Sequence, residues 1–348
     1  MEARVSGHSL ADALAVARKV VNVALPNLIK VSSFPGHVQV QATNLETYLT
    51  IWVPAETLEE GKACVYVEGL RRVVKKGKDL RLWTRDGHLV VQVGDVGSGL
   101  SLVSVEEFPN FPNPTYQSTL PTKLLLSAIE RVEFAVAKHK NSMGYGYLFV
   151  GGKGSIVSFV AGDGFRFAVF KAEVPFEDRI ELPYRSLEVL KTLLEKEEEE
   201  TIKVGKEKSF VFLAGTNWEA ALRVKFWSFP DYREIIPKKF KTRIVLDIEE
   251  LDRALQGFSS VEEVVFHIDK KLKLTTKRVK NRKVEKIETE ITAKVEGQTL
   301  SAAFSPKLLK EFTKSNKGTV EILLTDNNRP AVFKLGEDFL YLLIPKRI

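Results

Sequence analysis

The order of predicted secondary-structure elements repeats three times along the chain, at intervals of roughly 110 to 125 residues. Each third begins with an amphipathic helix, because apolar residues recur there at helical spacing. These first helices are expected at Ser9–Val23, from Pro121 onward and from about Asp247. A second helix with an apolar stripe follows each of them and is expected at Val67–Lys76, Tyr184–Glu200 and Ser305–Lys314. The repeat predicts three similar folding units.

Alternating apolar and polar residues between the helices predict antiparallel strands and hairpins, with Gly, Asp and Asn at the breaks. The alternation is present in Val38–Tyr48, Leu80–Val93, Tyr147–Phe170, Phe210–Phe226, Arg243–Leu246 and Val320–Leu324. Helices in such a chain can cover one face of each sheet. The predicted fold class is α+β, with three similar domains of antiparallel sheets and two helices each.

Two proline-rich segments mark the domain junctions. The segments Glu106–Thr115 (EEFPNFPNPT) and Ser228–Pro237 (SFPDYREIIP) each contain Phe-Pro followed by Asn or Asp. Neither a helix nor a central strand accommodates such clusters of proline. The predicted domains are therefore residues 1–116, 117–237 and 238–348.

The composition is that of a globular protein, with 44% apolar residues in a chain of 348. Cys64 is the single cysteine, so neither an internal disulfide nor a zinc site built from several cysteines is expected. The sequence contains no run of 18 apolar residues and no secretory signal pattern. We therefore expect a soluble cytoplasmic protein.

The net charge of +7 comes entirely from the last third of the chain, which contains 23 Lys and Arg against 16 Asp and Glu. Basic residues are densest in Lys270–Lys286, where they alternate with Leu, Val and Thr as in an exposed hairpin. Two interpretations stay open for this segment. It contacts a polyanion, or it is a solvated edge hairpin whose lysines prevent edge-to-edge pairing.

No motif for an enzyme, cofactor or metal site stands out. The glycine-rich segment Gly146–Ser155 lacks a phosphate-binding pattern, because Gly154 follows Lys153 where Ser or Thr is needed. No serine lies in a nucleophile-elbow motif. The acidic run Glu197–Glu200 is expected to be a solvated helix end. The histidines are scattered without metal-ligand spacing, at positions His8, His37, His88, His139 and His267.

Five segments in order carry a resemblance to a known family: TNLETYL (Thr43–Leu49), EFPNFP (Glu107–Pro112), AGDGFRFAVF (Ala161–Phe170), FPDYREIIP (Phe229–Pro237) and YLLIPKRI (Tyr341–Ile348). Together they resemble the bacterial sliding clamp, the beta subunit of DNA polymerase III. The resemblance spans essentially the whole chain. It implies a non-enzymatic, dimeric ring of six similar domains that encircles double-stranded DNA, is loaded by a clamp loader and tethers the replicative polymerase. It implies no cofactor and no membrane partner.

The resemblance also implies helices with a diffuse positive surface around the DNA. The candidate DNA-binding residues are Arg18, Lys19, Arg71, Arg72, Lys75, Lys76, Arg131, Lys138, Lys140, Lys307, Lys310 and Lys314. Ordinary solvated helix faces produce the same pattern, so this alternative stays open.

In the family, an apolar cleft accepts short linear motifs of polymerases and other replication or repair proteins. The matching residues here are Gly162, Phe165, Arg166, Phe167, Pro230, Ile235, Leu342, Ile344, Pro345, Lys346, Arg347 and Ile348. The alternative is that Phe165, Phe167, Leu342 and Ile344 are simply core residues of two strands. The departures are Gly162, Phe165 and Phe167, where the family usually has Thr, His and Leu, which predicts a narrower and more aromatic cleft.

The residues at the expected ring interface depart from the family pattern. The segment Gly97–Val103, which the resemblance places at the ring interface, has Ser98 where the family commonly has an aromatic residue. One alternative function is therefore a clamp-like interaction module that does not close on DNA. A second is a hydrolytic enzyme that uses dispersed carboxylates.

Overall fold

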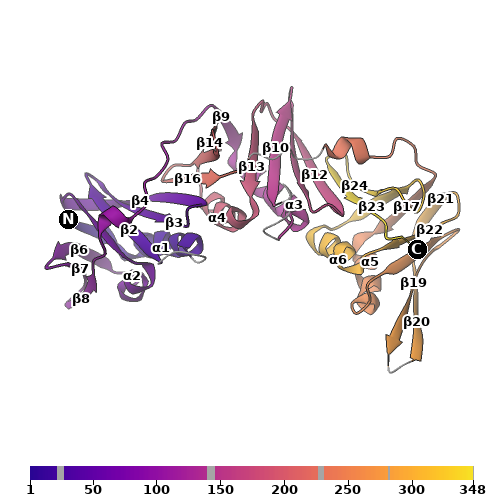
Figure 1. Cartoon of the computed structure of the whole chain (residues 1–348), viewed down its shortest axis with the longest axis horizontal. Helices are drawn as coiled ribbons and strands as arrows, with labels where there is room; N and C mark the ends of the chain where they lie inside the picture. The colour runs from indigo at the N-terminus through magenta and orange to yellow at the C-terminus, as the bar shows by residue number, and fades with distance from the viewer. Residues whose placement is uncertain (22–26, 139–145, 226–230, 281–282, 348) are drawn as a thin grey trace. The chain divides into compact units, whose positions relative to one another are not determined.

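The computed structural model describes residues 1–21, 27–138, 146–225, 231–280 and 283–347, without the side chains of 277–280 and 283–285. Among these residues the predicted repeat is present (Figure 1). A strand and a helix are followed by four strands, a second helix and three strands, and this order occurs twice. The last third repeats it with five strands between its helices.

The elements of the first third are β1 (Glu2–Ser6), α1 (Gly7–Val21), β2 (Leu28–Phe34), β3 (His37–Thr43), β4 (Thr47–Glu59), β5 (Gly61–Tyr66), α2 (Val67–Val73), β6 (Asp79–Arg85), β7 (His88–Val93) and β8 (Val96–Ser101). Those of the second third are β9 (Ser118–Pro121), α3 (Thr122–Val132), β10 (Tyr147–Lys153), β11 (Ile156–Gly162), β12 (Arg166–Glu173), β13 (Arg179–Pro183), α4 (Tyr184–Leu194), β14 (Thr201–Glu207), β15 (Phe210–Ala214) and β16 (Trp218–Arg223).

The elements of the last third are β17 (Thr242–Asp247), α5 (Ile248–Leu255), β18 (Val264–Ile268), β19 (Leu272–Lys280), β20 (Lys283–Ile291), β21 (Lys294–Gly297), β22 (Leu300–Phe304), α6 (Pro306–Ser315), β23 (Thr319–Leu324), β24 (Ala331–Leu335) and β25 (Phe339–Leu343). Short 3-10 helices are η1 (Val105–Glu107), η2 (Glu133–Ala135), η3 (Tyr232–Ile235) and η4 (Gln256–Phe258).

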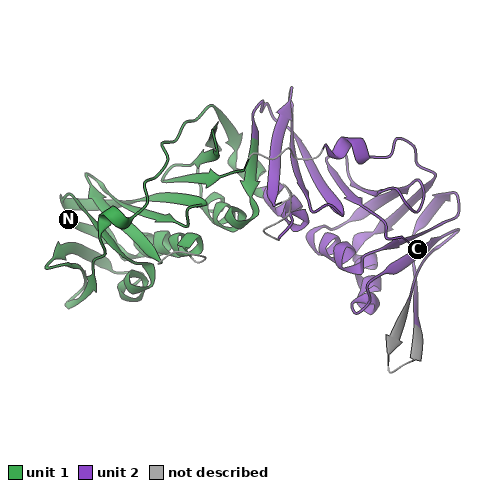
Figure 2. Ribbon diagram, viewed as in Figure 1, with its two compact units in different colours: residues 1–126, 180–226 green, residues 127–179, 227–348 purple. Residues whose placement is uncertain are grey.

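The sheets continue across the repeat boundaries. Strand β4 of the first third pairs with β16 of the second, so that Tyr48 lies opposite Ala221. Strand β12 of the second third pairs with β25 of the last, so that Phe167 lies opposite Leu342. The second third is thereby divided between two compact units, residues 1–126 with 180–226 and residues 127–179 with 227–348 (Figure 2). The three-domain division stays a prediction.

Unit 1, the first of these, has a sheet in the order β8-β7-β6-β1-β4-β16-β15-β14-β9, and β2, β3 and β5 branch from it through β4. Helix α1 packs on β3 and β4 and also contacts α2 and α4. Its apolar stripe, including Leu10, Leu14 and Ala17, is buried as the helical spacing predicts. The three helices lie along one side of unit 1 (Figure 1).

Unit 2 contains a sheet with the order β10-β11-β12-β25-β24-β23-β17-β21 and a smaller sheet with the order β20-β19-β18-β22. Helices α5 and α6 pack against each other. The ring of Phe312 on α6 stacks on Tyr341 of β25, with 4.8 Å between the ring centroids. This stack fixes α6 on the larger sheet. No helix among the described residues is long and apolar enough to cross a membrane.

Aromatic residues in or directly after the two proline-rich segments cover the two strand pairs that join neighbouring thirds of the chain. Phe111 and Tyr116 pack on the cluster around Tyr48 and Ala221 in unit 1. In unit 2, Tyr232 belongs to the buried cluster that contains Phe167 and Leu342. The proline-rich segments therefore contribute to the core, because each covers the strand pair that joins one third of the chain to another.

Helix α4 ends at Leu194, six residues earlier than predicted, and Glu197 beyond its end is partly buried, whereas Glu198, Glu199 and Glu200 are exposed as expected. The Glu197 carboxylate accepts hydrogen bonds from Trp218 Nε1 at 2.7 Å and from the Thr216 amide at 3.0 Å. Although partial burial acts to raise the pKa of Glu197, these and further hydrogen bonds outweigh it and lower the pKa. Glu197 thus ties the end of α4 to the turn between β15 and β16.

We predict that Glu197→Gln lowers the midpoint of thermal unfolding at pH 7 by about 2 to 4 °C, which corresponds to about 1 kcal/mol. The stabilisation is complete above the ordinary carboxyl pKa of 4.5 and is lost as the pH falls through the lowered value. The difference between variant and wild type must therefore shrink below pH 4.5 in a calorimetric series. Exposed Glu198→Gln is the control, and an equal effect of both variants would contradict the prediction.

Candidate functional site

Most candidate DNA-binding cations of unit 1 are paired with carboxylates. Arg18 Nε lies 2.6 Å from Glu68 Oε1, and Arg71 Nη1 lies 3.1 Å from the other oxygen of Glu68. Lys19 Nζ lies 3.2 Å from Glu188 Oε1 and donates a hydrogen bond to Thr192. The helix face of unit 1 is therefore a mixed surface of both signs.

Asp12 on α1 holds two lysines. One carboxylate oxygen accepts a hydrogen bond from Lys76 Nζ and the other from Lys196 Nζ, each at 2.8 Å. These hydrogen bonds, first from Lys196 and then from Lys76, lower the pKa of Asp12 to about 2. The side chain is therefore charged at any pH near neutrality. Arg72 and Lys75, in contrast, are exposed and form no ion pair with another described residue.

In unit 2, Arg131 is paired with Asp338 at 2.9 Å and its guanidinium lies over the ring of Phe170. Lys138 is exposed. Helix α6 presents Lys307 and Lys314 to solvent, and Lys310 donates a hydrogen bond to Ser259 Oγ. Buried Leu309 and Phe312 occupy the opposite face of α6, whereas Lys140 lies outside the described residues.

Salt bridges at the base of the basic hairpin, formed by β19 and β20, neutralise part of its positive charge. Lys271 lies 2.7 Å from Glu290, and both Lys273 and Lys286 pair with Glu288. These two lysines lower the pKa of the exposed Glu288 to about 2. The remaining side chains of the predicted basic segment, from 277 to 285, lie outside the described part.

Three apolar cleft candidates reach the surface of unit 2. Phe165 is 66% exposed, Ile235 is 36% exposed and Ile344 is partly exposed. The Ile344 amide donates a hydrogen bond to the Phe165 carbonyl at 2.9 Å, which places these two residues side by side. A pair of neighbouring, solvated apolar side chains can receive the anchor residues of a peptide.

Two further candidates form the layer beneath this surface. Phe167 and Leu342 are buried in the cluster with Tyr232. The alternative of alternating core residues is therefore correct for Phe167 and Leu342 but not for exposed Phe165. A Cβ at Gly162 would lie 2.7 Å from Cδ1 of Phe167. Glycine at this position makes room for the larger ring, so these two departures from the family pattern compensate each other.

Arg166 is 4% exposed, so its guanidinium is not available to a partner, contrary to the expectation from the sequence. Its Nε donates a hydrogen bond to Asp163 at 2.9 Å, and its Nη2 donates one to the Phe134 carbonyl at 2.7 Å. The same Nη2 lies 2.6 Å from Glu311 on α6. A buried arginine requires such partners, and this one links the turn that carries Phe165 to α6.

The end of the chain lies along β22. The Lys346 amide donates a hydrogen bond to the Ala303 carbonyl at 2.8 Å, and Lys346 Nζ donates one to the Glu262 carbonyl. Pro345 is buried and Arg347 is exposed. Lys346 is therefore anchored, which the sequence pattern did not reveal. Two remaining cleft candidates, Pro230 and Ile348, lie outside the described residues.

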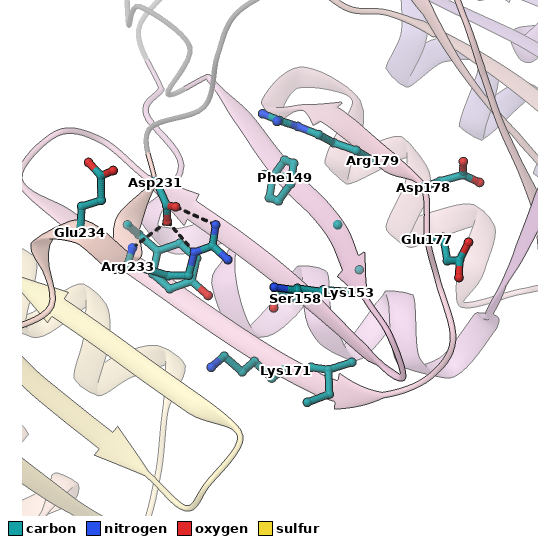
Figure 3. A pocket seen from close by; sticks show the side chains of 14 residues that line it. Phe149, Lys153, Ser158, Lys171, Glu177, Asp178, Arg179, Asp231, Arg233 and Glu234 are labelled. Atoms are coloured by element: carbon teal, nitrogen blue, oxygen red, sulfur yellow. Dashed lines mark hydrogen bonds and ion pairs between the residues drawn. The ribbon is translucent and has the colours of Figure 1, made fainter.

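A pocket of about 700 Å³ that the sequence did not predict opens beside η3 (Figure 3). Its walls include Phe149, over which the guanidinium of Arg179 lies 4.8 Å from the ring centroid. Asp231 and Arg233 form a salt bridge at another edge of the pocket. Tyr232 belongs both to this pocket and to the cluster beneath the cleft. A signal for it in the sequence is the pair Gly151-Gly152, because a Cβ at Gly152 would overlap the carbonyl oxygen of Phe176.

Two observations concern metal ligands and nucleophiles among the described residues. Among them, no group of three or more His, Cys, Asp or Glu side chains is placed to hold a metal ion. The thiol of Cys64 is buried, and burial raises its pKa to about 11, so it is a poor nucleophile.

Comparison with known proteins agrees with the resemblance, although no family model matches the chain. The beta sliding clamp of Rickettsia bellii is 23% identical over 351 residues, which cover 92% of this chain and 91% of that protein. The beta sliding clamp of Bacillus subtilis is 23% identical over 275 residues, covering 74% of this chain and 72% of that protein.

Solved structures match over the whole chain. The DNA polymerase III beta subunit of Thermotoga maritima has a TM-score of 0.91 and 24% identity, covering 100% of this chain and 99% of that one. The Caulobacter crescentus polymerase III beta has a TM-score of 0.91 and 20% identity, covering 100% of both chains. The chain therefore has the fold of the bacterial beta sliding clamps and is similar to them in sequence along nine-tenths of its length.

Proposed function

We propose that this chain is a DNA polymerase processivity factor that acts as a ring around double-stranded DNA. The observation that supports this most is the match to sliding clamps over the whole chain at a TM-score of 0.91. A closed ring holds DNA by enclosure and needs no contact with particular bases. It tethers a polymerase by raising the effective concentration of the enzyme at the primer end.

Ring closure requires two complementary ends. Strand β8 is the last strand of the sheet in unit 1, and β21 is the last strand of the larger sheet in unit 2. Each has an edge with unpaired backbone groups, which natural proteins pair or cover. We infer that β8 of one copy pairs with β21 of a second copy, and that the same contact occurs twice in a closed dimer.

The cleft around Phe165, Ile235 and Ile344 is the proposed attachment site for the polymerase and the clamp loader. It offers exposed apolar side chains on a rigid base, because Phe165 sits on the turn fixed by the buried Arg166 network. In this proposal the protein performs no covalent chemistry and requires no cofactor.

Retention on circular and linearised plasmid tests the enclosure directly. After loading with a clamp loader and ATP, the protein should stay on the circular form at moderate salt and run off the linear form. The amount on each form is measured by gel filtration of labelled protein. Equal loss from both forms would mean that the protein does not encircle DNA.

Removing the last residues of the chain would disturb unit 2, because Pro345 and Lys346 contribute to its packing. A point substitution is therefore the better test of the cleft. Phe165→Ala should weaken binding of a carboxyl-terminal peptide of the replicative polymerase by about tenfold, the cost expected for an anchor contact. Leu58→Ala, which truncates an exposed apolar residue of unit 1, should leave the affinity unchanged. Binding is measured by isothermal titration calorimetry, and equal affinities of both variants would reject this cleft.

The second candidate function is a clamp-like interaction module that does not close into a ring. It is favoured by the small side chains Gly97, Ser98 and Gly99 on β8, which offer few side-chain contacts at the proposed interface. The ring proposal predicts sedimentation as a dimer of the 39.1 kDa chain at micromolar concentration. A monomer at that concentration would support the module instead.

A further inference from the structure

The cations on the helix face of unit 1 share a few carboxylates. Four of the six candidate DNA-binding cations of unit 1 are paired with Asp12, Glu68 or Glu188. Asp12 also holds Lys196, so these three carboxylates neutralise part of a group of five cations. The three carboxylates come from α1, α2 and α4, the helices that lie along one side of unit 1 (Figure 1).

Stability alone does not account for this arrangement. Ion pairs between exposed side chains contribute about 0 to 1 kcal/mol each, because water screens the charges and the long side chains lose freedom. The paired groups are largely in this class, since the side chains of Arg18 and Glu68 are 49% and 40% exposed. What the carboxylates change strongly is the local charge: five positive charges are reduced to a net charge of two.

We propose that Asp12, Glu68 and Glu188 lower the affinity of this helix face for DNA, so that the ring slides along the duplex instead of staying bound at one position. This inference rests on the proposed function. A paired cation that contacts a phosphate either leaves its carboxylate or brings the negative charge of that carboxylate close to the phosphate, so each contact gains less free energy than one from an unpaired cation. The net gain per contact is small, and the barrier to moving along the backbone is small for the same reason.

Asp12 shows this pairing most clearly. Its two oxygens are both occupied by lysine ammonium groups, one from the segment after α2 and one from the segment after α4. Its pKa, lowered from 3.8 to about 2, means that it stays negative at pH values where an ordinary aspartate becomes protonated. In unit 2, Arg131 has a similar arrangement with Asp338, so the pairing of candidate cations is not confined to one unit.

The test is the affinity of the full-length protein for a fluorescent duplex of about 20 base pairs, measured by anisotropy between 50 and 200 mM salt. Asp12→Asn frees Lys76 and Lys196, and Glu68→Gln frees Arg18 and Arg71. Each variant should bind about 3- to 10-fold more tightly at the lowest salt. Because each new phosphate contact adds about 0.9 to the slope of log affinity against log salt, the slope should steepen by about one to two.

Glu60→Gln is the matched control, since it removes the same charge from an exposed residue in the turn between β4 and β5, away from the helices. Thermal unfolding checks that each variant folds, and Glu68→Gln carries the test if Asp12→Asn does not fold. The inference is overturned if the two variants bind no more tightly than Glu60→Gln, or more weakly than wild type. Retention of the wild type on circular plasmid tests the proposed function separately, so either proposal can fail while the other stands.

Discussion

The pairing of strands across repeat boundaries is the constraint on which the rest of the structure depends. The pairs β4–β16 and β12–β25 convert three sequence repeats into two interleaved units. Each pair is covered by aromatic residues from a proline-rich segment, Phe111 and Tyr116 in one unit and Tyr232 in the other. The proline-rich segments, which the sequence marks as domain boundaries, thus complete the hydrophobic cores at these two strand pairs. The cleft candidates lie at one of these junctions, because Phe165 and Ile344 directly precede and follow the paired strands.

The fold was largely predictable from the sequence because local signals and the repeat agree. All six helices of the described residues begin within about two residues of their predicted starts, and the alternating runs are strands. The compact units were not predictable, because strand pairing between distant segments leaves no local pattern. The end of α4 was placed too late for a related reason. Glu197 reads as one more charged helix residue, and only the distant turn at Thr216–Trp218 shows why the chain leaves the helix there.

The sequence predicted which residues lie at the candidate site better than it predicted which of them are exposed. Motif matching places Phe165, Arg166 and Phe167 together, yet only Phe165 is exposed. Alternation in a strand predicts that neighbours point to opposite faces, but it does not tell which face is covered by a later segment such as η3. The helix cations show the same limit. Charge is visible in the sequence. Its pairing is mostly not, because only Arg71 finds its carboxylate, Glu68, on its own helix, whereas Arg18, Lys19, Lys76 and Lys196 pair with residues on other helices.

The fit between Gly162 and the ring of Phe167 has a consequence for how the cleft tolerates mutation. A Cβ at position 162 would lie 2.7 Å from Cδ1 of Phe167, so a larger residue there requires the ring to move. That ring belongs to the buried layer beneath the exposed cleft candidates. The two positions are therefore coupled, and the effects of substitutions at them should not be additive.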